Sequence, residues 1–267
     1  MYKRILTGVI GLPLMAFVMI HSESVLILSL LLIALVGQNE LHRAYSKKIT
    51  LHLVALLLTT IYFLLLFITL NHYFIFFIIF LSLLLLSLLL MVVYHKTINI
   101  ESVTITIFGF LYLAGALSSI YFLRNINIYI VWLPFIAAWG CDTGAYFIGK
   151  KWGKRKLCPS LSPSKTWEGA IGGSITACIL AFIYALIVYN FDIILKPDIM
   201  IYTFTTLIVS IFSQIGDLAA SKIKRQVDIK DFGKLFPGHG GVLDRFDSIL
   251  LAAPVVYIFA IIFWRIY

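Results

Sequence analysis

The chain has 267 residues, of which 61% are hydrophobic and only 12% are charged, and its mean hydropathy is +1.02. A water-soluble domain of this length cannot bury so much apolar surface, so the composition excludes an ordinary soluble enzyme and indicates a bilayer protein. The net charge of +9 would suit nucleic acid, but the basic residues are distributed as in a membrane protein, and no nucleic-acid partner is expected.

Nine stretches are apolar enough to cross a bilayer, which takes about 20 residues of helix. The stretches are continuously apolar and do not alternate, which favours helices over the strands of a barrel. The expected fold is therefore all-α, a polytopic membrane protein with about nine transmembrane helices. The expected spans are 5–21, 24–41, 50–70, 73–94, 102–123, 128–149, 169–190, 198–220 and 248–267.

The first stretch resembles a signal peptide, because Lys3 and Arg4 precede it, but no small-residue cleavage site follows, so we interpret it as a retained span. With the N-terminus in the cytoplasm, nine spans place nearly all of the 21 Lys and Arg residues inside. Only Arg124, Lys196 and Arg265 then lie outside. The positive-inside rule thus predicts a cytoplasmic N-terminus and an external C-terminus.

The two parts of the chain differ in polarity. Residues 1–128, with spans one to five, are predicted to form a transmembrane scaffold, and their acids are Glu23, Glu40 and Glu101. Residues 129–267 hold spans six to nine, nine of the twelve acids and two cytoplasmic loops, at 150–168 and 221–247, and are predicted to be the catalytic region. The cysteines, Cys141, Cys158 and Cys178, fit no metal or disulfide pattern and are interpreted as structural.

Two of the later spans carry polar residues on one helical face near the cytoplasmic end. These are Asp142, Tyr146 and Gly149 in one span, and Ser213, Asp217, Ser221 and Lys224 in another. One buried Asp could simply pair with a basic residue for packing. Two such stripes, each followed by a basic loop on the same side, favour a functional site.

The first loop ends in LSPSKTWEG, which brings Ser162, Ser164 and Lys165 to the start of a predicted helix. Hydroxyls, a lysine and backbone N–H groups at a helix N-terminus can bind phosphate. The spacing is not that of a P-loop, and an ordinary capped helix start is the alternative.

The second loop ends in FPGHGGVLDRFD, residues 236–247. Its glycines allow close backbone approach to a ligand or positive φ. Asp244 and Asp247 follow, and carboxylates beside basic side chains suit Mg²⁺ bound with a polyphosphate. His239 could contact phosphate, bind metal or be an ordinary loop residue, and the absence of a second nearby His disfavours zinc.

The whole stretch SKIKRQVDIKDFGKLFPGHGGVLDRFD, residues 221–247, resembles the signature of the bacterial phosphatidate cytidylyltransferases, or CDP-diacylglycerol synthases. WGCDTGAYFIGKKWGKRKLCPSLSPSKTWEG, residues 139–169, is similar to a second block of that family. The resemblance implies a nucleotidyltransferase of phospholipid biosynthesis in the cell membrane, with its active site facing the cytoplasm. CTP and phosphatidate would give CDP-diacylglycerol and pyrophosphate. It also implies Mg²⁺, a second cation for which K⁺ is a candidate, and a homodimer as one possible assembly.

The same resemblance implies roles for individual residues. Catalytic roles fall on Asp217, Asp244, Lys165 and Arg245, with Asp217 and Asp244 as metal ligands. Substrate binding falls on Asp142, Ser162, Ser164, Lys224, Arg225, Lys230, Asp231, His239, Gly240, Gly241 and Asp247.

Two other functions remain open on the sequence, and a third lacks its motif. A transporter would also use intramembrane Asp residues, although it calls for polarity near the midplane, whereas charge here gathers on one side. A CTP-dependent polyprenol kinase would share the nucleotide site but transfer the γ-phosphoryl group. A CDP-alcohol phosphotransferase would need an Asp-Gly-x₂-Ala-Arg motif, which the chain lacks.

Overall fold

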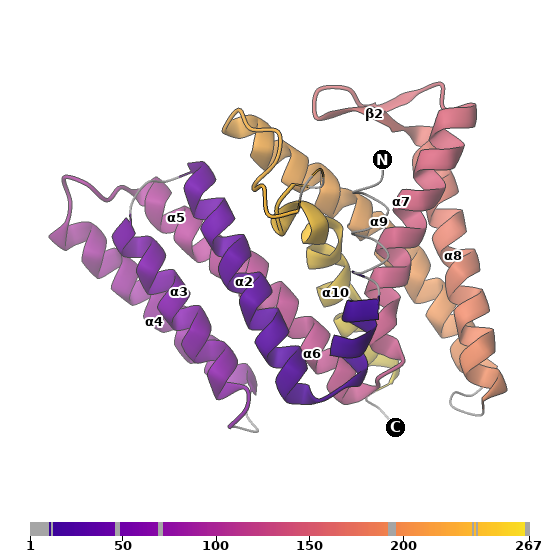
Figure 1. Cartoon of the computed structure of the whole chain (residues 1–267), viewed down its shortest axis with the longest axis horizontal. Helices are drawn as coiled ribbons and strands as arrows, with labels where there is room; N and C mark the ends of the chain where they lie inside the picture. Colours follow the sequence, from indigo (N-terminus) through magenta and orange to yellow (C-terminus); the bar gives the residue numbers. More distant parts are fainter. Residues whose placement is uncertain are drawn as a thin grey trace. The chain divides into compact units, whose positions relative to one another are not determined.

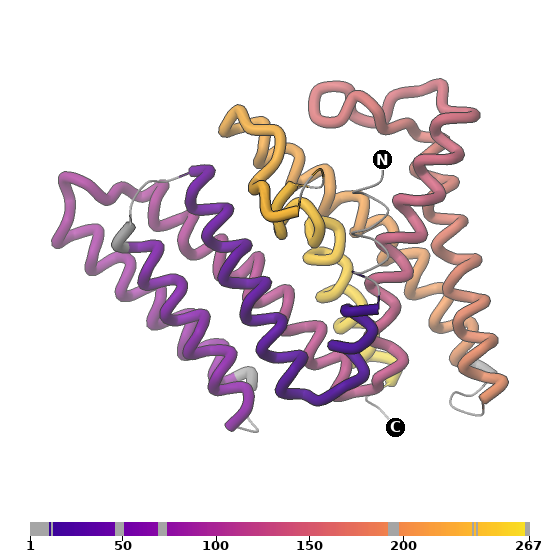
Figure 2. Tube along the Cα trace, in the orientation of Figure 1, coloured from indigo at the N-terminus to yellow at the C-terminus, as the bar shows by residue number. Residues whose placement is uncertain are grey.

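A computed structural model describes residues 11, 13–45, 49–68, 72–191, 196–236, 238 and 240–264, and these residues are mostly helical (Figures 1 and 2). Residues 5–10 and 12 of the span expected at 5–21 lie outside the described residues. The chain divides into two compact units. The first unit comprises Met1–Tyr121 and Val227–Arg245, and the second comprises Phe122–Gln226 and Phe246–Tyr267.

The first unit is a group of packed helices. They are α2 (Glu23–Tyr45), α3 (Ile49–Leu65), α4 (His72–Val93), α5 (Ile100–Gly109), a π-helix (Phe110–Gly115) and the start of α6 (Ala116–Ile126). Both α2 and α4 pack against α3 and α5. Tyr62 of α3 lies edge-on against Phe63, Phe76 and Phe110, with ring centroids 5.4, 5.5 and 5.9 Å away. Aromatic packing therefore joins these helices.

The second unit is built on three long helices that pack on one another. They are α7 (Leu133–Trp152), α8 (Trp167–Asn190) and α9 (Lys196–Gln226), and the unit also holds most of α10 (Leu243–Phe263). Glycines let the backbones of α7 and α8 approach closely: a Cβ on Gly140 would lie 3.0 Å from the Cα of Ala177, and one on Gly173 would lie 2.5 Å from the carbonyl oxygen of Cys141. Small residues at such contacts are typical of membrane helix pairs.

A β-hairpin occupies the position of the expected loop 150–168, so the all-α expectation was wrong at this point. α7 continues to Trp152, and strand β1 (Lys156–Cys158) pairs antiparallel with β2 (Ser162–Thr166). The Glu168 carboxylate accepts hydrogen bonds from the backbone N–H groups of Lys154, at 3.0 Å, and Arg155, at 3.2 Å. These bonds tie the start of the hairpin to α8, a contact between residues that no helical periodicity reveals.

Within the described residues, six helical stretches are long and apolar enough to cross a membrane. They are Glu23–Tyr45, Phe74–Val93, Ile100–Ile126, Trp167–Asn190, Asp198–Gln226 and Leu243–Phe263. The span expected at 50–70 is the shorter apolar helix Leu51–Leu65. The one expected at 128–149 corresponds to α7, whose polar residues leave it outside the six. Six such helices fit a multi-pass membrane protein, while the count of nine and the orientation of the termini remain predictions.

Candidate active site

A cavity of about 350 Å³ lies in the second unit, between α7, the hairpin, α8 and α9. Asp142, Tyr146 and Gly149, which form the predicted polar stripe of α7, line it together with Lys150. Ser164 and Lys165 of β2 line another part. Of the site residues predicted in the 139–169 block, Asp142, Ser164 and Lys165 therefore come together around one cavity, whereas Ser162 is not among the residues that line it.

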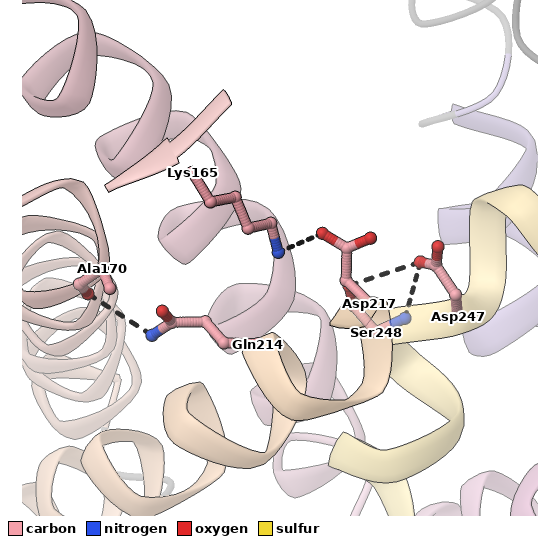
Figure 3. A network of polar contacts seen from close by, with 6 residues as sticks. All are labelled: Lys165, Ala170, Gln214, Asp217, Asp247 and Ser248. Atoms are coloured by element: carbon pink, nitrogen blue, oxygen red, sulfur yellow. Dashed lines mark hydrogen bonds and ion pairs between the residues drawn. The ribbon is translucent and has the colours of Figure 1, made fainter. Parts of the chain in front are cut away.

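Lys165 forms an ion pair with Asp217 of α9 (Figure 3). The two side chains are 25% and 26% exposed, so their charges are only partly screened by solvent. Lys165 lies directly before Thr166, whose hydroxyl caps α8 by accepting from the Gly169 N–H at 3.1 Å. The cap fixes the end of the hairpin, and with it the position from which Lys165 reaches Asp217.

The N-terminus of α8 itself has fewer backbone donors than the sequence suggested. The Gly169 N–H is bonded to Thr166, and the Trp167 N–H donates to the Arg155 carbonyl at 2.9 Å. Phosphate binding at this end of α8 would therefore rely mainly on side chains such as Lys165.

Asp247 of α10 lies beside Asp217 (Figure 3). Gly216 permits this approach, because a Cβ there would lie only 2.6 Å from the Asp247 carbonyl oxygen. Asp247 lies in the electrostatic field of two other carboxylates, those of Asp217 and Asp142, and of the Lys224 ammonium group. The Asp247 carboxylate accepts from the Ser248 N–H at 2.7 Å. The Asp217 carboxylate thus lies between the Lys165 ammonium group and the Asp247 carboxylate (Figure 3).

Gln214 is a cavity residue that the sequence patterns did not single out. Its side-chain amide donates to the Ala170 carbonyl at 3.3 Å and to the Ser174 hydroxyl at 3.1 Å (Figure 3). It lies three residues before Asp217, so one helical turn links the two. That spacing was the available signal.

The segment that precedes α10, residues 232–242, contains four glycines and is termed the glycine loop. Two buried carboxylates of the first unit accept hydrogen bonds from this loop and from the start of α10. Asp244 accepts at Oδ2 from the N–H groups of Phe232, at 2.8 Å, and Gly241, at 2.9 Å. Glu40 of α2 accepts from those of Val242, at 3.0 Å, and Leu243, at 2.9 Å. Glu40 lies in the predicted transmembrane scaffold, for which no site residue is predicted. An acidic residue within an apolar helix is the sequence signal that indicates a role for it.

The other predicted residues are placed as follows. Ser162 starts β2 opposite Cys158, Arg225 is exposed in the last turn of α9, and Lys230, Asp231 and Arg245 are exposed in the first unit. Gly240 has φ +80°, which favours glycine. His239 lies outside the described residues. Asp217 and Asp244 belong to different units, so their meeting at one metal stays a prediction.

Comparison with known proteins agrees with this arrangement of motifs. Residues 2–263 match the cytidylyltransferase family. The chain is similar to proteins named phosphatidate cytidylyltransferase: 43% identical over 145 residues to that of Bacillus subtilis, covering 53% of this chain and 52% of the relative. It is 44% identical over 128 residues to that of Haemophilus influenzae, covering 48% and 44%.

A protein of the same name from Staphylococcus saprophyticus is 40% identical over 153 residues, covering 57% of this chain and 54% of the relative. The chain thus spans about half the length of these curated relatives. The family match, in contrast, extends over nearly the whole sequence and includes both polar blocks and the apolar helices before them. The chain therefore belongs to the cytidylyltransferase family.

Proposed function

We propose that this protein transfers the cytidylyl group of CTP to phosphatidate, giving CDP-diacylglycerol and pyrophosphate. The observation that carries the proposal is the Lys165–Asp217 pair at a polar cavity, with Asp247 alongside, in a chain of this family. Relatives named phosphatidate cytidylyltransferase support the choice of substrates.

The chemical step joins two anions, so its main barrier is charge repulsion and alignment. An oxygen of the lipid phosphate, already ionised near neutral pH, attacks the α-phosphorus of CTP. The bond from that phosphorus to the bridging oxygen of the β-phosphate breaks, and pyrophosphate leaves with the electron pair. No proton has to be removed from the nucleophile. The enzyme must hold the two phosphates in line and neutralise them.

Basic side chains of the second unit are suited to that task. Lys165 and Lys150 line the cavity, and Lys224 lies near Asp247 in the last turn of α9. A lysine acts on phosphate as a point charge, whereas an arginine such as Arg225 can bind one bidentately. Lys165 is the most constrained of them, because Asp217 orients its ammonium group.

The carboxylates fit Mg²⁺ as the predicted cofactor. Among the side chains that the structure describes, no three His, Cys, Asp or Glu form a ready metal site. Mg²⁺, however, commonly takes only one or two carboxylates, and substrate phosphates complete its octahedron. Asp217 and Asp247 would hold it, beside an ammonium group that already marks a place for positive charge. When bound, the ion would neutralise the polyphosphate as a Lewis acid.

Asp244, the second ligand implied by the resemblance, has a different environment. Its Oδ2 accepts two backbone hydrogen bonds, and its side chain is only 8% exposed. A metal role for Asp244 would have to use Oδ1, or break both bonds. We retain that role as a prediction.

The proposed location is the cell membrane, with the site open to the cytoplasm. Phosphatidate keeps its acyl chains in the bilayer and its phosphate at the interface, whereas CTP arrives from water. The exposed hairpin at one end of α7 and α8 supports a site at a helix end, and the six apolar helices support a bilayer setting.

The test is an assay of the purified protein in detergent with phosphatidate, Mg²⁺ and CTP labelled at the α- or the γ-phosphate. We expect the α-label in a CDP-lipid and the γ-label in pyrophosphate. Appearance of the γ-label in a phospholipid, with CDP released, would instead identify a lipid kinase and contradict the proposal. A protein without either activity would also contradict it.

A further inference from the structure

Glu40 is one of three acidic residues in the apolar N-terminal part of the chain, residues 1–128. It lies near the end of α2, and its side chain is 7% exposed. Burying a carboxylate is costly unless charged or hydrogen-bonding partners compensate it. Its partners are the backbone N–H groups of Val242 and Leu243, each bonded to a different carboxylate oxygen.

These two N–H groups lie at the beginning of α10. The first N–H groups of a helix have no partner inside the helix, and its N-terminus attracts negative charge. A side chain from the flanking loop usually fills this role. Here the cap comes from α2, some 200 positions earlier in the chain, and both of its oxygens are used.

Two glycines of the loop are shaped to this carboxylate. A Cβ on Gly241 would collide with both Glu40 oxygens, and a Cβ on Gly233 would collide with Oε1. The backbones of Gly233 and Gly241 also approach each other closely, since a Cβ on Gly233 would lie 3.1 Å from the Cα of Gly241. The missing side chains therefore make room for Glu40, a reason for glycine that is independent of any nucleotide.

Asp244 completes the arrangement from the other side. Its carboxylate accepts hydrogen bonds from the N–H groups of Phe232 and Gly241. Gly240 has φ +80°, and a Cβ on it would lie 2.6 Å from Oδ2 of Asp244. Four backbone donors of the loop are therefore bound to two carboxylates. The shape of segment 232–245 depends on both.

We propose that Glu40 is a positioning residue of the enzyme: it holds the glycine loop and the first turn of α10 so that Asp244 and Arg245 keep fixed directions. Glu40 itself touches neither substrate. The part concerning activity rests on the proposed function, and the part concerning the loop does not. The N-terminal half of the chain, on this view, contributes directly to the shape of the signature segment.

The first test is amide hydrogen exchange of the full-length protein in detergent, for peptides covering residues 232–245. Glu40→Gln leaves one acceptor oxygen for two donors, and we expect exchange at 242 and 243 to become about tenfold faster or more. Glu40→Asp, which keeps both oxygens, should recover part of the protection. Glu101→Gln, an exposed acid in the same unit, is the matched control and should change nothing.

Unchanged exchange in Glu40→Gln would overturn the proposal. If that variant does not fold, the unsubstituted protein decides, because rapid exchange at 242 and 243 would show that no carboxylate holds them. Activity is measured alongside, and we expect kcat to fall in Glu40→Gln and to be partly restored in Glu40→Asp, with little change in KM for phosphatidate. Loss of exchange protection at full kcat would overturn the positioning role. If the unsubstituted protein transfers no cytidylyl group, the proposed function fails while the exchange result still stands.

A second test uses the collision between Glu40 and position 241. Gly241→Ala should lower kcat, because its methyl group meets the carboxylate. Adding Glu40→Ala removes that collision, so the combined loss should be smaller than the product of the two single losses. Combining Gly241→Ala with Glu101→Gln should give the simple product. A simple product for the Glu40 pair as well would contradict the proposed contact.

Discussion

Lys165 is one of the two lysines that line the cavity, and its ion pair with Asp217 fixes the position of its ammonium group. Their partial burial matters, because an ion pair in full solvent is worth little, whereas one at a cavity wall orients both groups. We expect the same pair to serve two states: with substrates absent the ammonium neutralises Asp217, and with substrates and the proposed Mg²⁺ bound the ammonium would face phosphate and Asp217 would face the metal ion.

Asp217→Asn tests this function of the pair. The amide keeps the size of the side chain but loses its charge, so we expect kcat with Mg²⁺ to fall about 100-fold or more, with the protein still folded. Initial rates over a Mg²⁺ titration check the prediction. Asp198→Asn, in the first turn of the same helix, is the control and should retain activity. Near-normal turnover in Asp217→Asn would remove this residue from the site.

Asp244 raises a different question, because it caps a loop and is also predicted to bind metal. Asn at this position keeps an acceptor oxygen for the Phe232 and Gly241 N–H groups, whereas Ala leaves both without one. We expect Asp244→Ala to lower the free energy of unfolding by about 1–3 kcal/mol, and Asp244→Asn to lower it less.

Activity separates the two roles of Asp244. If it binds metal, both variants should lose Mg²⁺-dependent turnover, although only Asp244→Ala is clearly destabilised. Thermal unfolding and initial rates in the same detergent provide the comparison, with the exposed turn variant Lys96→Gln as control. Full activity in a stable Asp244→Asn protein would leave Asp244 a structural cap only.

At the scale of elements, the second unit depends on close packing of α7 and α8. Gly144 approaches Thr176, and Gly173 approaches the Cys141 carbonyl, so neither helix can accept a side chain at these points. This contact also fixes the cavity wall, since Cys141 and Asp142 are neighbours on α7 and both line the cavity.

Gly173→Ala should therefore be costly for a single methyl group. A Cβ there would lie 2.5 Å from a backbone oxygen, so the helices must separate, and we expect a loss of about 1–3 kcal/mol in the free energy of unfolding. Gly115→Ala is the matched control, because its Cβ would meet Phe76 at an ordinary 3.4 Å. Equal stability of the two variants, measured by thermal unfolding, would contradict the packing argument.

How far the sequence predicts each element depends on the range of the interactions that form it. Apolar runs mark α2, α4, α8, α9 and α10, because a spanning helix satisfies its own backbone. The hairpin was not predicted, since Ser162–Thr166 has no strand pattern. The base of the hairpin is closed by hydrogen bonds that join Arg155 to Trp167 and Glu168. The stripes on α7 and α9 identified Asp142 and Asp217, because one helical period is enough to align them.

Glu40 shows what a single sequence cannot give. Its partners come about 200 positions later, and they are backbone groups with no side-chain signature of their own. Gly241 did indicate close approach to the backbone or a positive φ, but not that a carboxylate of the same chain lies there. Local patterns thus single out the signature segment, and only the structure shows that its Gly233 and Gly241 lie against the Glu40 carboxylate.

At the scale of the whole molecule, the distribution of basic residues predicts which side of the membrane the hairpin faces. Nearly all Lys and Arg residues, including those of the hairpin, fall on the predicted cytoplasmic side, and Arg124 falls on the other. A substrate that arrives from the cytosol requires this orientation. Since the charges lie in loops between apolar helices, the opposite orientation would reverse the bias.

Cys158 offers a native probe for that orientation, because it lies in β1 and is partly exposed, whereas Cys141 is buried. In a Cys141→Ser, Cys178→Ser protein, we expect a membrane-impermeant thiol reagent to label Cys158 in inside-out vesicles and not in right-side-out ones. Arg124→Cys, in a protein with all three native cysteines replaced, should show the reverse. Labelling of Cys158 from outside the cell would overturn the predicted topology, and the cytoplasmic site with it, because CTP could not then reach Lys165.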